Sequence, residues 1–150
     1  MSLLTAFHNV LQQFLDDLIY IFPELSDLKT MQTLVQLMRS ANPRMVQYNF
    51  LEVAGRYHEN IFKCEEAFFY NLDNWKDDPY FDKHKEQTGD DMLFQRLVVF
   101  KDEWKSLTST NKNKIWTYLQ QLLVLSAKAN THDQLQPISN AVLECAIKNR

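Results

Sequence analysis

Residues 42–68 read NPRMVQYNFLEVAGRYHENIFKCEEAF, and this stretch decides the fold class. Asn42 and Pro43 supply an N-cap residue followed by the imino acid favoured in a first helical turn. The stretch therefore predicts one long helix over about residues 43–71. Apolar side chains follow at intervals of three or four residues, which places them on one helical face: Val46, Phe50, Val53, Tyr57, Ile61, Cys64 and Phe68.

Gly55 lies inside this predicted helix without breaking the apolar spacing. A glycine there costs about 1 kcal/mol relative to alanine. A helix tolerates such a residue where a neighbour packs closely or where the helix kinks, so we expect one of these at Gly55. The only other glycine among the 150 residues is Gly89. Phosphate-binding loops and nucleophile elbows need glycine at positive φ, so this composition disfavours both.

The helical spacing continues on both sides of this stretch. A first helix is predicted from Leu3 to Phe22 and is stopped by Pro23. A second helix, capped by Ser26 or Asp27, is predicted through Met38. Further along the chain we expect three more helices, at about residues 90–107, at 111–129 with Ser109 or Thr110 as cap, and a short one opened by Pro137.

These predictions together give an all-α fold, with residues 1–150 forming a single-domain multi-helix bundle of five to six helices. The 43–71 and 111–129 helices are expected at its centre. The 111–129 helix is apolar on nearly every side, which is typical of a helix buried in a bundle or paired with another chain. Burial is the favoured interpretation.

The composition indicates what the protein can bind and in which compartment it acts. The net charge of −3 provides little general attraction to nucleic acid or to an anionic membrane. Cys64 and Cys145 fall on apolar stripes, so we expect buried thiols in a reducing, intracellular compartment. The apolar N-terminus is interrupted by polar residues, and neither a signal peptide nor a membrane span is expected.

No motif indicates a metal, a cofactor or a catalytic centre. None of the four histidines has an acid three residues before it, so the di-iron signature is absent. The stretch from Asp73 to His84 resembles a calcium loop but lacks the glycine at its sixth position and the glutamate at its twelfth. The sequence therefore favours a non-catalytic protein. A metal-dependent or hydrolytic enzyme whose site is built from residues distant in sequence stays open.

Two segments are candidates for binding. Residues 72–89 form a long connection with many acids, and long connections often carry function. Its aromatic residues Trp75, Tyr80 and Phe81 are our candidates for binding a protein partner or a second copy of the chain. Lys112 and Lys114 begin the fifth predicted helix, where they could contact phosphate. The alternative function is therefore a nucleic-acid-associated factor in transcription or packaging.

The aromatic spacing over roughly residues 5–127 also resembles a known group. The pattern comprises Tyr57-x3-Ile61-x3-Glu65-x2-Phe68-Phe69 and, later, Trp104-Lys105-x-Leu107-x3-Asn111-Lys112-x2-Ile115-Trp116. It resembles small, uncharacterised all-helical proteins of large nucleocytoplasmic DNA viruses. The resemblance implies a virus-encoded protein that acts inside an infected cell, in the host cytoplasm or nucleus, or in a virion. It assigns no activity and no catalytic residue.

Overall fold

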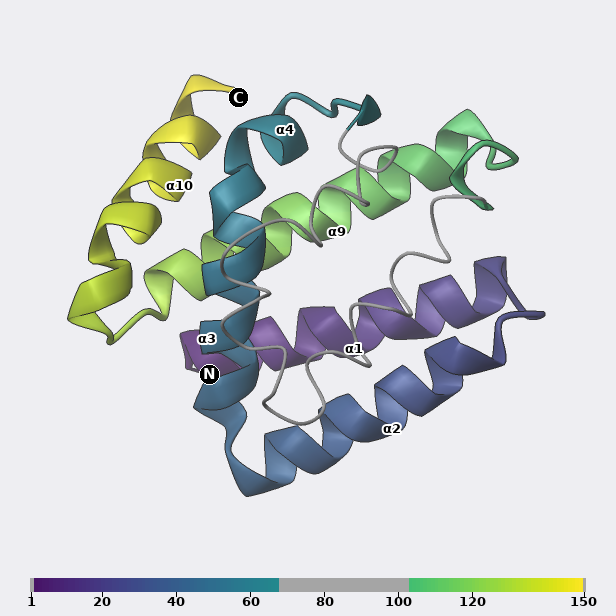
Figure 1. Ribbon diagram of the computed structural model, residues 1–150, viewed down its shortest axis with the longest axis horizontal. Coiled ribbons are helices and arrows are strands. Elements are labelled where there is room, and N and C mark those ends of the chain that lie inside the picture. The colour runs from purple at the N-terminus through teal and green to yellow at the C-terminus, as the bar shows by residue number, and fades with distance from the viewer. Residues whose placement is uncertain (1, 68–102, 150) are drawn as a thin grey trace.

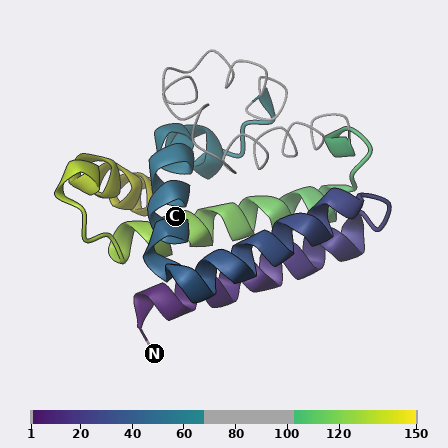
Figure 2. The same cartoon turned by 60° about the horizontal axis from the view of Figure 1, so that its bottom comes forward.

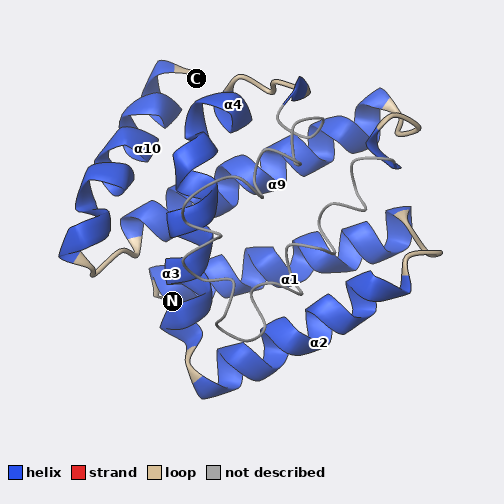
Figure 3. Cartoon of the chain, in the orientation of Figure 1, coloured by secondary structure: helices blue, strands red, loops and turns tan. Residues whose placement is uncertain are grey.

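The computed structural model describes residues 2–67 and 103–149, and the regular elements among them are all helical (Figures 1 and 3). This confirms the predicted all-α multi-helix bundle. The predicted helix at 90–107 lies outside the described residues except at its end, where Glu103 and Trp104 are helical. The α-helices are α1 (Leu3–Ile21), α2 (Ser26–Ala41), α3 (Pro43–Ala54), α4 (His58–Phe62), α9 (Ser109–Lys128) and α10 (Gln136–Lys148), with 3-10 turns η1 (Gly55–Tyr57) and η3 (Asp133–Leu135).

Helix α9 is the centre of the described bundle. It packs against α1, α3, α4 and α10, while α2 lies beside α1 on the outside (Figures 1 and 2). None of its large apolar side chains is exposed. The nearly all-apolar helix predicted at 111–129 is thus covered by its own chain. The main core includes Leu15, Leu18, Leu28, Leu51, Ile61, Trp104, Trp116, Leu123 and Val142.

A row of polar side chains joins α1 to α2. Arg39 donates to the Asn9 side chain at 3.3 Å, Gln36 to that of Gln12 at 3.3 Å, and Gln32 to Asp16 at 2.6 Å. These three bonds pair the polar side of α1 with α2 and hold the two helices in antiparallel register.

The predicted single helix over 43–71 is wrong in two places. It changes to a 3-10 turn at Gly55 and it ends at Phe62. The reason at Gly55 is the close approach of α10, because a Cβ built on Gly55 would lie 2.5 Å from Cγ2 of Ile138. Both expected causes, close packing and a local change of helix geometry, are therefore present at this glycine.

The end of α4 overturns the expectation for Cys64. This residue adopts a positive φ of 53°, and its thiol is exposed. The helix has already ended, so the apolar spacing no longer places this position on a buried face. Cys145 is buried, as predicted.

Two predicted helix caps are also wrong, by one or two residues. Ser26 is the first residue of α2 and Leu25 is its cap, with no side-chain bond. Thr108 caps α9, accepting a hydrogen bond from the backbone N–H of Asn111 at 3.2 Å. In contrast, Asn42 caps α3 as predicted, accepting from the N–H of Met45.

Candidate functional site

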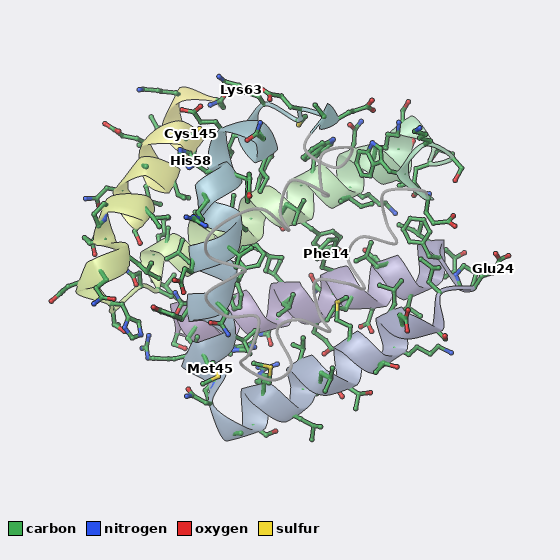
Figure 4. All side chains as sticks on the ribbon, viewed as in Figure 1. Phe14, Glu24, Met45, His58, Lys63 and Cys145 are labelled. Atoms are coloured by element: carbon green, nitrogen blue, oxygen red, sulfur yellow. The ribbon has the colours of Figure 1, made fainter. Side chains whose placement is uncertain are left out.

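A cleft of about 260 Å³ lies between the α1–α2 turn and the segment that enters α9. Helix α1 stops before Pro23, and the turn that follows carries Glu24 at the outer end of the molecule (Figure 4). The opposite wall is the turn that precedes the Thr108 cap. The lining combines apolar and polar side chains: Ile21, Phe22, Pro23, Glu24, Leu25, Glu103, Ser106, Leu107, Thr108 and Asn111.

The two carboxylates of this cleft have no partner among residues 2–67 and 103–149. Within the part of the chain that the structure describes, no cation or hydrogen-bond donor reaches the side chain of Glu24 or Glu103. The acids on nearby α1 differ. Asp16 accepts a hydrogen bond from Gln32, and Asp17 accepts one from Tyr118. The cleft therefore holds negative charge that no described residue offsets.

The Tyr118–Asp17 pair has a structural role. The phenol donates to the carboxylate across the α1–α9 contact, and its ring stacks on Phe14 with centroids 5.1 Å apart. The carboxylate stabilises the protonated phenol, and this bond together with burial raises the pKa of Tyr118 to about 12. The phenol therefore stays protonated at neutral pH and holds α1 against the central helix.

The predicted phosphate contacts lie at the start of α9 but are not equivalent. The Lys112 ammonium is 2.9 Å from the Glu66 carboxylate and 5.5 Å from the centroid of the Trp104 ring. It is thus occupied by a charge pair and a cation–π contact. Lys114 is exposed. A phosphate at Lys112 would have to compete with Glu66.

The predicted partner-binding residues Trp75, Tyr80 and Phe81 lie outside the described residues, as does His84. The other three histidines are not brought together. His58 Nδ1 bonds to the Gly55 carbonyl oxygen at 2.6 Å, and His132 packs edge-on to the Tyr48 ring. Nowhere in residues 2–67 or 103–149 do three or more His, Cys, Asp or Glu side chains form a group suited to a metal ion.

His8 is the buried polar residue that sequence reasoning missed. It is only 3% exposed, and its Nε2 bonds to the Pro43 carbonyl oxygen at 2.8 Å. Its buried Nδ1 has no hydrogen-bond partner among the residues that the structure describes. Burial lowers the pKa of His8, the bond to Pro43 partly offsets this, and the nearby Arg39 charge lowers the pKa further. The imidazole is therefore neutral in the folded protein at pH 7.

We expect folding stability to decrease as the pH falls below about 6.5, the ordinary pKa of histidine. Because the folded-state pKa is lower than the unfolded one, the unfolded chain binds more protons in this range. Urea denaturation at stepped pH measures the effect. The His8→Gln variant keeps an N–H for the Pro43 carbonyl but does not titrate, so its decrease should be shallower. Equal decreases in the two proteins would contradict the assignment.

The cleft had no signature in the sequence. Glu24 follows a helix-stopping proline, and Glu103 falls near the end of a predicted helix, so each resembles an ordinary surface acid. They line the same cleft only because α1 and α9 pack alongside each other. Gln47 was missed in a similar way, since this 1%-exposed side chain donates to the Ser126 carbonyl oxygen at 2.8 Å.

Comparison of the chain with protein families, with curated proteins and with solved structures finds no match. Among the described helices, none combines the length and the hydropathy needed to cross a lipid bilayer.

Proposed function

We propose that this protein is a non-catalytic helical interaction or assembly module. The observation that carries the proposal is Tyr20, whose side chain is 86% exposed on α1, directly before the cleft-lining Ile21. Tyrosine anchors interfaces because its ring buries a large apolar area while its hydroxyl keeps a polar partner. An exposed tyrosine alone would be unremarkable. Tyr20 precedes Ile21, which lines a cleft whose two acids have no partner among the described residues, and this supports a binding surface.

The nucleic-acid alternative gains no support from the described residues, since the Lys112 ammonium already pairs with Glu66. The interaction module therefore remains the better proposal. Trp75, Tyr80 and Phe81 stay predicted partner contacts, and the viral origin stays a proposal based on the residue pattern alone.

The test is a quantitative pull-down of the tagged protein from the cells that express it, with and without nuclease. Tyr20→Ala should weaken capture of a stoichiometric protein partner about tenfold, the loss typical of a moderate interface anchor. Trp75→Ala and Tyr80→Ala should weaken it while leaving the helical circular dichroism unchanged.

Ile147→Ala is the matched control. It truncates a side chain that is 66% exposed on α10, on the other side of the molecule from the α1–α2 turn (Figure 1). Its capture should equal that of the unaltered protein. Loss of the captured partner on nuclease treatment would favour the alternative function, a nucleic-acid-associated factor. Equal capture by Tyr20→Ala and Ile147→Ala would reject this surface as the contact.

A further inference from the structure

We propose that the cleft between the α1–α2 turn and the start of α9 binds an arginine side chain from a basic segment of the partner. This inference deepens the proposed function and rests on it. Three features of the cleft carry it: two carboxylates that have no partner in the described part of the chain, an apolar wall and the size of the cleft.

Charge decides the class of ligand. The lining contains Glu24 and Glu103 and no lysine, arginine or histidine. A cation entering the cleft would meet two carboxylates that no described cation neutralises. A calcium ion would need six to eight oxygen ligands, with several supplied by carboxylates, whereas the described residues offer no group of three or more acids here. An organic cation fits this donor set better.

The walls decide between organic cations. Ile21, Phe22, Leu25 and Leu107 provide apolar surface along the cleft. A long basic side chain places its methylene stem on such surface and extends its charged head toward polar groups. The volume of about 260 Å³ lies below the range of about 300–1,000 Å³ typical of sites for drug-sized ligands. The cleft is therefore suited to one side chain.

The number of acceptors favours arginine over lysine. Besides the two carboxylates, the lining includes the polar residues Ser106, Thr108 and Asn111. The Thr108 hydroxyl accepts a hydrogen bond from the N–H of Asn111, and the Ser106 hydroxyl donates to the Glu103 carbonyl oxygen. Each hydroxyl oxygen therefore retains a lone pair for a further donor. A guanidinium presents five N–H donors in a planar fork and can address several acceptors at once, with charge-assisted bonds to the carboxylates. A lysine ammonium has only three donors on a compact head, so it can bond to fewer of these acceptors at once.

The test is an NMR titration of the full chain with the probe peptide acetyl-Ala-Arg-Ala-amide at low salt. The matched probe contains citrulline, which has nearly the same shape as arginine but no charge. Amide shifts should centre on residues 21–25 and 106–111. The citrulline peptide should bind at least about tenfold more weakly, since it forfeits the charge-assisted bonds.

Two double variants separate the site from general charge. Glu24→Gln/Glu103→Gln should weaken binding of the arginine peptide by about tenfold or more. Glu59→Gln/Glu144→Gln makes the same change in net charge at exposed positions on α4 and α10 and should leave binding unchanged. Equal binding of the two peptides, an equal loss in both double variants, or shifts centred elsewhere would overturn the inference.

Failure of this inference is distinguishable from failure of the proposed function. If the arginine peptide does not bind but Tyr20→Ala still weakens capture of the partner, the proposed interaction module is kept and only the arginine-binding site is rejected. If Tyr20→Ala has no effect on capture, the surface itself is rejected.

Discussion

Replacing Trp116 with alanine should lower the free energy of unfolding by about 3–5 kcal/mol, the usual cost of removing a buried aromatic side chain. Trp116 is 4% exposed in the main core, and its ring meets that of Trp104 edge-to-face with centroids 5.5 Å apart. A domain of this kind is stable by about 5–15 kcal/mol in total. The single change should therefore remove a large share of the stability, and urea denaturation measures it.

The neighbouring residue is the control for Trp116→Ala. Thr117 is exposed, and its hydroxyl donates to the Asn113 carbonyl oxygen within the same helix. Thr117→Ala should change stability by less than about 0.5 kcal/mol, as surface substitutions usually do. A loss below about 1 kcal/mol for Trp116→Ala would contradict the placement of this ring in the core.

Replacing Gly55 with alanine should destabilise the fold, although alanine is the better helix former. The propensity gain is about 1 kcal/mol, whereas overpacking a core costs typically about 1–3 kcal/mol. The new methyl group would lie 2.5 Å from Cγ2 of Ile138, far inside contact distance. Because isoleucine is branched at Cβ, this methyl group cannot turn aside easily. We expect a net loss of up to about 2 kcal/mol.

A double-mutant cycle identifies the cause of that loss. Removing the Cγ2 atom with Ile138→Ala costs stability by itself, but it should make Gly55→Ala neutral or stabilising in that background. Urea denaturation of the four proteins gives the coupling energy. If Gly55→Ala costs the same with and without Ile138, then the close approach of α10 does not explain the glycine.

The sequence predicted the fold class because apolar periodicity is a local signal. The α1 stripe, the Asn42–Pro43 start and the apolar α9 helix can each be read within one or two helical turns. The end of α4 could not be predicted in that way. The apolar spacing continues through Cys64, but the chain takes a positive φ there.

The candidate site depends on tertiary contacts, which a local pattern does not encode. Glu24 and Glu103 face one cleft because of how α1 and α9 pack, and His8 is buried because α3 offers it the Pro43 carbonyl. His8 and Gln47 show that a polar side chain can occupy the core when a backbone carbonyl from another helix accepts its hydrogen.

The interaction surface itself can be tested by site-specific photo-crosslinking in the cells that express the protein. A photoreactive phenylalanine analogue replaces Tyr20 in one version and Ile147 in the other. We predict that position 20 cross-links to one discrete protein, in a nuclease-resistant product, and that position 147 does not. Absence of a product from position 20, or a product that nuclease removes, would contradict the proposal that this surface binds a protein.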